Sequence, residues 1–199
     1  VLAAFGWAAE RVPDPAQKGP FAVGFTSYTV IDSTRPGDGG VYAHRPIPVY
    51  VWYPVDQSTI TGATPSASYP LDPLYEVIPS ESSTTFEQYG IDPAYHEVAA
   101  SPKKPFPVLL FSPGWGAPAW MHASVAARLA SHGFVVAVPY HFGDQWWPWE
   151  PPYDHVALAS FNRPRDVSFV LTDLLTKNSS AGHILSGSMR PNQVSAGGW

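Results

Sequence analysis

The sequence predicts an α/β domain in which a parallel sheet carries helices on both of its faces. In the second half of the chain, continuous apolar runs alternate with segments of helical periodicity, which is typical of buried strands separated by helices. In the first half, two segments rich in β-branched and aromatic residues are joined by turn residues, which predicts an antiparallel hairpin. With 199 residues, of which 45% are hydrophobic, the chain can bury a substantial core.

The first half begins with the predicted hairpin. Its strands cover residues 21–31 and 47–53, and the turn chemistry lies in the Pro- and Gly-containing segment 34–40. From residue 54 to residue 104 the pattern gives way to Ser, Thr, Pro and isolated tyrosines. A loop of this length inside a compact domain is usually functional or mobile. We therefore expect an insertion that borders a site, with a short helix near residues 81–89.

Three apolar or β-prone runs in the second half predict adjacent parallel strands. Residues 106–111 (FPVLLF) and 134–138 (FVVAV) are continuous apolar runs, and residues 193–197 are a shorter candidate close to the end of the chain. An antiparallel hairpin that leads into a parallel sheet is a mixed arrangement. Antiparallel pairing among the three runs would contradict this prediction.

Two helices are predicted between these strands. The first covers residues 118–132, with Met121, Val125 and Leu129 at a spacing of four as its expected apolar face, and Gly133 follows as a C-terminal cap. The second covers residues 163–176 and carries an apolar stripe formed by Val167, Val170, Leu171 and Leu174. Pro164 and Asp166 fall in its expected first turn, where proline and acidic residues are both favourable.

Composition excludes several classes of function. Only 14% of the residues are charged, the net charge is −5, and no Lys/Arg cluster occurs, so binding to nucleic acid or to an anionic membrane is not expected. The chain has no cysteine, and its seven histidines lack metal-ligand spacing. We therefore expect no metal and no other cofactor. Many Pro, Trp and Tyr residues and few lysines favour a secreted or periplasmic protein.

The last residues of the chain, 193–199 (QVSAGGW), are a strand candidate that runs into Gly-x. A nucleophile elbow has the pattern Gly-x-Ser-x-Gly, in which a sharp turn between strand and helix exposes the serine oxygen and the glycines avoid a clash. Gly198 would be its first glycine and Trp199 the residue before the nucleophile. No serine within the chain has the flanking pair of glycines. We expect the nucleophilic serine beyond Trp199.

Residues 112–116 (SPGWG) directly follow the predicted strand 106–111. In a fold with this kind of elbow, the loop after that strand supplies one backbone N–H to the oxyanion hole. We assign this donor to the amide of Trp115, with Gly114 allowing the backbone to approach the substrate. An ordinary strand-to-helix turn also favours Pro and Gly, so this alternative stays open.

These stretches resemble the dienelactone-hydrolase-like group of the α/β-hydrolases, which includes bacterial relatives of platelet-activating factor acetylhydrolase and polyester-degrading cutinases. The resemblance implies that residues 1–199 are the N-terminal half of one α/β-hydrolase catalytic domain. It also implies a serine carboxyl-ester hydrolase whose triad serine, acid and histidine all lie beyond Trp199. The segments that carry the resemblance are 19–23, 113–115, 129–136, 163–167 and 198–199.

Aromatic residues and one histidine are candidates for contact with the substrate. Trp146, Trp147 and Trp149 lie in the loop 144–153, where they would form an apolar wall for an acyl group or pack under the insertion at 54–104. His141 follows a strand end, and the resemblance implies a structural or pocket-lining role for it. Trp199 and Gly114 complete the expected substrate-binding set.

Other functions on this sequence stay open. An amide-bond hydrolase would use the same scaffold. A non-catalytic, aromatic-rich carbohydrate-binding module would predict an all-β pattern. Three core strands alone leave a sheet edge uncovered, so we expect a second chain that begins with the nucleophilic serine. Self-cleavage after Trp199, cutting by another protease and an arbitrary boundary are all consistent with this expectation.

Overall fold

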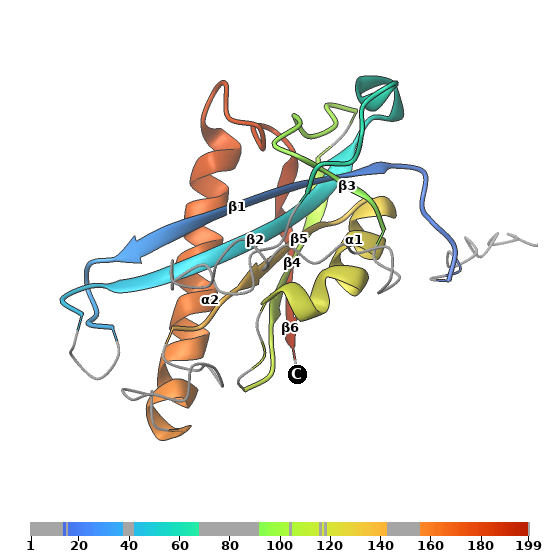
Figure 1. The fold of residues 1–199 in the computed structure, drawn as a ribbon. Coiled ribbons are helices and arrows are strands. Elements are labelled where there is room, and N and C mark those ends of the chain that lie inside the picture. The colour runs from blue at the N-terminus through green and yellow to red at the C-terminus, as the bar shows by residue number, and fades with distance from the viewer. Residues whose placement is uncertain are drawn as a thin grey trace, which may run out of the picture.

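The computed structural model describes residues 14, 16–37, 42–67, 92–103, 105–115, 117, 119–142 and 156–198. Within these residues, six strands form one sheet in the order β3-β1-β2-β5-β4-β6 (Figure 1). The strands are β1 (Ala22–Asp32), β2 (Arg45–Val55), β3 (Ala94–His96), β4 (Phe106–Ser112), β5 (Val135–Pro139) and β6 (Met189–Gly198). The helices are α1 (Ala123–Ser131) and α2 (Val156–Ser179), with two short 3-10 helices, η2 (Gln57–Ile60) and η5 (Ala119–His122).

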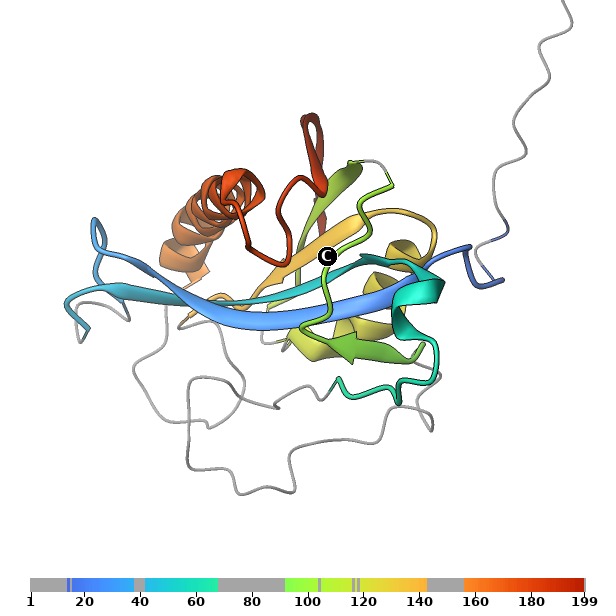
Figure 2. The same ribbon diagram turned by 90° about the horizontal axis from the view of Figure 1, so that it is seen from above.

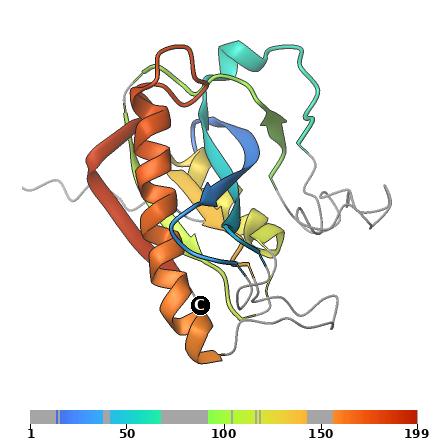
Figure 3. The ribbon, with the colours of Figure 1, turned by 90° about the vertical axis from the view of Figure 1, so that its left-hand side faces the viewer.

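The sheet is antiparallel on one side and parallel on the other. β1 and β2 form the predicted hairpin, which pairs Asp32 with Arg45 at one end, and β2 pairs antiparallel with β5. β5, β4 and β6 are adjacent and parallel, as predicted. α1 and α2 lie on opposite faces of this sheet (Figures 2 and 3). This is the α/β-hydrolase fold, and it differs from the all-β pattern of a carbohydrate-binding module.

The central strands bury both of their faces. All five residues of β5 are buried, and β2 is buried over almost its whole length. β6 lies at an edge of the described sheet, and most of its residues are exposed. This difference explains why continuous apolar runs identified β5 and β4, whereas the polar β6 gave only a short strand signal.

The apolar face predicted for α1 is wrong at two of its three positions, since only Leu129 packs against the buried cluster. Met121 is 57% exposed and Val125 is 51% exposed, and Met121 belongs to η5 rather than to α1. The buried face consists of small residues, which share one cluster with Phe25, Tyr50 and Trp52 of the sheet. These small residues are Ala123, Ala126, Ala127 and Ala130. Because alanines let a helix lie close to a sheet, the large aromatic residues of the strands fill the space that larger helix residues would otherwise fill.

This close contact makes α1 intolerant of larger side chains on its buried face. Ala127→Leu is expected to lower the free energy of unfolding by about 1–3 kcal/mol, because the fully buried Ala127 has no space for three more carbon atoms. The control Val125→Leu, on the exposed face, should change it by less than about 0.5 kcal/mol. Urea unfolding measures both values, and equal values for the two variants would contradict the observed helix face.

The predicted start of α2 is also wrong. The helix begins at Val156 rather than at residue 163, so Pro164 and Asp166 lie in its interior. Pro164 is exposed there, where its ring points away from the sheet although one helical hydrogen bond is lost. The buried positions form one continuous stripe at spacings of three and four, namely Ala159, Asn162, Asp166, Val170 and Leu174. Two members of this stripe are polar, which concealed the first turns of the helix in the hydrophobic pattern.

The segment 54–104 contains more regular structure than a loop. β2 extends to Val55, and β3 adds a short edge strand that runs parallel to β1. A strand of three residues is too short to show periodicity, so only its pairing with β1 reveals it. The short helix expected at 81–89 lies outside the described residues. No helix in the described ranges combines the length and apolarity needed to cross a bilayer.

Candidate active site

The carboxyl ends of the parallel strands β4, β5 and β6 meet at one edge of the sheet (Figure 1). Ligand sites of open α/β sheets form at this edge. The last paired residues of β4 and β6 are Ser112 and Gly198, which lie directly opposite each other. The start of the predicted oxyanion loop therefore lies beside the start of the predicted elbow.

Gly198 occupies a position where only glycine fits. A Cβ atom on Gly198 would lie 2.3 Å from the backbone oxygen of Ser112, which is far inside van der Waals contact. A Cβ atom on the neighbouring Gly197 would have its nearest contact at 3.9 Å, from Leu109 Cδ1. The first glycine of a nucleophile elbow meets the same kind of steric requirement. This geometry supports the assignment of Gly198 to that position.

The loop after β4 begins with a turn at the same edge. Pro113 is buried, Gly114 is half-buried and the side chain of Trp115 is 42% exposed. The N–H of Ala117 donates to the oxygen of Gly114 over 3.0 Å, which closes the turn. The oxyanion role of the Trp115 amide stays a prediction. Trp146, Trp147, Trp149 and Trp199 all lie outside the described residues.

His141 lies just past β5 and is only 3% exposed. Its Nδ1 lies 3.0 Å from Oδ2 of Asp166, and its Nε2 lies 2.9 Å from Oγ of Ser112. Both ring nitrogens therefore have protein partners. Of the two roles expected for His141, structural or pocket-lining, these contacts favour the structural one. Direct contact of His141 with substrate stays a prediction.

Asp166, which is fully buried, is the centre of a charged cluster beneath His141. Arg45 donates from Nε to Oδ1 and from Nη2 to Oδ2, each over 2.8 Å, in a bidentate pair. Arg35 donates from Nη2 to Oδ1 of Asp166 over 2.8 Å, and from Nε to Asp32 over 2.6 Å. Within the described part of the chain, the cluster thus contains two carboxylates and two guanidinium groups, whose charges balance.

The cluster changes the acidity of its carboxylates. Burial alone would raise the pKa of Asp166, but hydrogen bonds from His141 and Arg45 outweigh it and hold that pKa below its usual value of 3.8. The pKa of Asp32 is likewise lowered, because hydrogen bonds from Thr34 and Arg35 outweigh its desolvation. Both carboxylates are therefore ionised at neutral pH and act only as hydrogen-bond acceptors.

Sequence reasoning missed this cluster. The sequence pattern predicts Asp166 in a first helical turn, and Ser112 lacks the flanking glycines of an elbow. The sequence contained one signal for this cluster, namely Arg35 and Arg45 on the two sides of the predicted hairpin turn. If these arginines are buried, they require carboxylate partners. Nothing in the sequence says which of the acidic residues those partners are.

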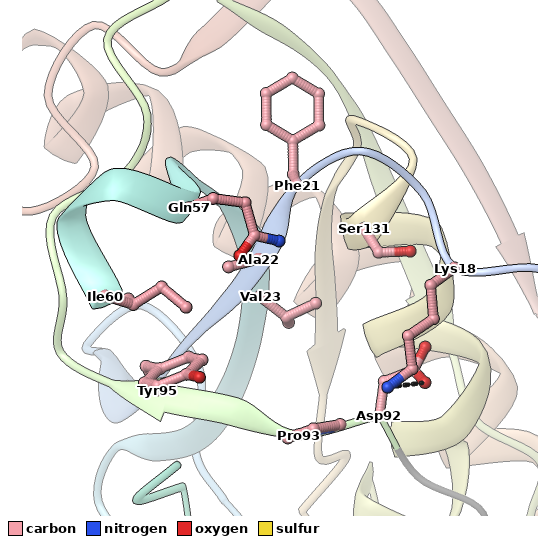
Figure 4. Close-up of a pocket in the computed structure, with 10 residues that line it drawn as sticks. All are labelled: Lys18, Phe21, Ala22, Val23, Gln57, Ile60, Asp92, Pro93, Tyr95 and Ser131. Atoms are coloured by element: carbon pink, nitrogen blue, oxygen red, sulfur yellow. Dashed lines mark ion pairs between the residues drawn. The ribbon is translucent and has the colours of Figure 1, made fainter. Parts of the chain in front are cut away.

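A separate pocket lies at the opposite edge of the sheet, near the start of β1 (Figure 4). It has a volume of about 100 Å³, and three of its polar side chains, those of Lys18, Asp92 and Ser131, have protein partners. Asp92 accepts a hydrogen bond from Arg128 over 2.6 Å and lies 3.6 Å from Lys18, and Ser131 Oγ accepts from the N–H of Gly19 over 2.9 Å. This pocket is small and far from the strand ends at Ser112, so it is not the candidate active site.

Comparisons with known proteins agree with this fold. No curated protein sequence matches the chain. The solved structure of a ferulic acid esterase from Streptomyces cinnamoneus is similar, with a TM-score of 0.64 and 21% sequence identity over 89% of this chain and 52% of that chain. The chain thus spans about half the length of that enzyme, and at this identity the likeness establishes the fold alone.

A family model identifies the group within the fold. The model described as platelet-activating factor acetylhydrolase, isoform II, matches residues 8–145, which is more than half of the 199 residues. The resemblance seen in the sequence is thereby confirmed for this group of hydrolases. The chain belongs to the platelet-activating factor acetylhydrolase, isoform II, family.

Proposed function

We propose that this chain is the N-terminal part of a serine carboxyl-ester hydrolase, in which the polypeptide that follows Trp199 supplies the nucleophilic serine, the triad acid and the triad histidine. The observation that carries the proposal is the pairing of Ser112 with Gly198, at a position where no side chain fits. This pairing supports an elbow that begins beside the loop Pro113–Trp115. The name of the structural neighbour, a ferulic acid esterase, is consistent with ester hydrolysis.

In this proposal the serine oxygen attacks the ester carbonyl carbon, and the triad histidine accepts the serine proton. The carbonyl oxygen becomes an oxyanion, which accepts hydrogen bonds from the Trp115 N–H and from the N–H of the residue after the serine. The carbon–oxygen bond of the ester then breaks, and the alcohol leaves with the proton from the histidine. Water hydrolyses the acyl-enzyme in a second, equivalent step. Each oxyanion donor typically contributes about 100- to 1,000-fold in turnover.

The same proposal assigns the substrate an apolar or aromatic acyl group. Trp115 is a large, partly exposed aromatic residue at the carboxyl edge of β4. Trp146, Trp147 and Trp149 follow β5 in the sequence and would extend the same aromatic surface. Pockets for small molecules are largely apolar, with few polar contacts, which fits this composition.

A serine-reactive phosphonate tests the function. The protein that contains this chain and the polypeptide after Trp199 should hydrolyse p-nitrophenyl butyrate, and a fluorophosphonate should abolish this activity. Mass spectrometry of the peptides should place the label on the serine directly after Trp199. Hydrolysis that is unaffected by the phosphonate would exclude a serine nucleophile. The intact mass of the same preparation tests the expected second chain, which should co-purify with an N-terminal serine.

A further inference from the structure

Ser112 is attached to its surroundings in two ways at the point where the chain leaves the sheet. Its backbone pairs with Gly198, and its hydroxyl lies 2.9 Å from Nε2 of His141. The next residue, Pro113, has no N–H to donate to a neighbouring strand. The hydroxyl of Ser112 is therefore placed to fix the direction in which the following loop begins.

The direction of each hydrogen bond follows from the charge of Asp166. The ionised carboxylate accepts only, so Nδ1 of His141 carries a hydrogen and donates to it over 3.0 Å. Among the described residues of the cluster, two carboxylates balance two guanidinium groups, so a neutral imidazole keeps this part of the cluster without net charge. Nε2 of the neutral ring is then an acceptor, and the hydroxyl of Ser112 donates its hydrogen to it.

We propose that His141 is a positioning residue of the proposed active site, which holds the Trp115 amide in place through Ser112. This inference rests on the proposed function. His141 itself is held by Asp166 of α2, which is in turn fixed by Arg45 at the start of β2 and by Arg35 of the hairpin turn. The loop is thus tied to α2 and to the hairpin, and not only to the neighbouring strand.

The order Ser112–His141–Asp166 is also the order of a catalytic triad, but the contacts favour a positioning role. The carboxylate of a triad stabilises the imidazolium that forms during catalysis. Here both oxygens of Asp166 already accept from guanidinium groups, so its charge is compensated before any proton moves. His141 and Asp166 are also almost completely buried, which leaves no room for substrate beside them.

A positioning role predicts a specific kinetic defect. Oxyanion donors act only when they lie within about 2.7–3.1 Å of the developing charge, so a small displacement of the loop lowers transition-state binding more than substrate binding. Ser112→Ala should therefore lower kcat for p-nitrophenyl butyrate by about 10- to 100-fold. KM should change by less than about twofold, because the acyl-binding surface is unchanged.

The matched variant is Ser112→Thr, which keeps the hydroxyl and should restore most of kcat. The rate constant for phosphonylation should fall with kcat in Ser112→Ala, because the phosphonyl oxygen uses the same donors. Urea unfolding should show that both variants are folded without urea, with a lower midpoint only for Ser112→Ala, which loses the hydrogen bond to the buried His141. Kinetics measured without urea therefore report on positioning and not on unfolding. His141→Phe serves as a second test and should show the same kcat defect in the fraction that is folded.

Three outcomes overturn the inference in distinguishable ways. If the wild type is labelled after Trp199 but Ser112→Ala retains full kcat, the positioning role fails and the proposed function stands. If Ser112→Thr is as defective as Ser112→Ala while both are folded, the hydroxyl is not the relevant group. If the phosphonate labels Ser112 itself, Ser112 is a nucleophile, and both this inference and the proposed nucleophile after Trp199 are wrong.

Discussion

Replacement of Gly198 by alanine is expected to lower the rate of ester hydrolysis by about 100-fold, which is the typical cost of misplacing reacting groups by about 1 Å. The new methyl group would lie 2.3 Å from the backbone oxygen of Ser112. That oxygen belongs to a strand of the sheet and cannot rotate away as a side chain would. β4 and β6 must therefore separate at their carboxyl ends, which moves the proposed elbow away from the proposed oxyanion loop.

The neighbouring residue provides a matched control. Gly197→Ala adds the same methyl group one position earlier, where the nearest atom is 3.9 Å away, and its activity should stay within about twofold of the wild type. The value of kcat/KM for a short ester, measured for all three proteins, decides the point. Equal activities of the two variants would show that Ser112 and Gly198 are not paired as described.

The second large effect is expected in the charged cluster. Asp166→Ala leaves the buried guanidinium groups of Arg35 and Arg45 without the carboxylate that they share. Removal of one partner from a buried ion pair typically lowers the free energy of unfolding by about 3–5 kcal/mol. Arg165 lies on the exposed side of α2, with its guanidinium carbon 3.7 Å from the ring centroid of the exposed Phe161, so the control Arg165→Ala should cost less than about 1 kcal/mol. Urea unfolding at pH 7 compares the three proteins.

The difference in unfolding free energy between the wild type and Asp166→Ala should depend on pH, which gives an independent test. The pKa of Asp166 is lower in the folded protein than the ordinary value of 3.8, so its carboxylate stabilises the fold fully above that value. This contribution is lost as the pH falls below 3.8 toward the lowered pKa, because the folded state then also takes up the proton. The gap in unfolding free energy between the wild type and Asp166→Ala should therefore narrow below about pH 4. A constant gap from pH 7 to pH 3 would contradict the ionised state of Asp166.

The fold could be predicted because its signals are local. Each apolar run of β4 and β5, and the turn residues between β1 and β2, can be recognised within about ten residues of sequence. The buried face of α1 could not be predicted in this way. An amphipathic pattern does not show whether the sheet has space for large or only for small helix side chains. Met121 and Val125 are more hydrophobic than the alanines that are in fact buried.

The candidate site also contains residues that a local motif predicts and residues that only the fold brings together. Gly198 and the loop around Trp115 belong to short motifs, so their positions next to each other could be expected before the structure. The link from Ser112 to His141 joins residues 29 positions apart, and the link from Arg45 to Asp166 spans 121 positions. Such pairs depend on how strands and helices assemble, and no local pattern of either residue identifies its partner.

The buried carboxylate of Asp166 also restricts how α2 can dock on the sheet. The stripe of α2 that faces the sheet repeats every three or four residues, so apolar contacts alone would tolerate a helix displaced by one turn. Such a displacement would place Asn162 or Val170 where Asp166 now meets the two guanidinium groups. Neither residue can neutralise them, and an uncompensated buried charge costs several kcal/mol. Misassembled forms of the domain are thus disfavoured by electrostatics, and a chain that lacks Asp166 should populate them more often during folding.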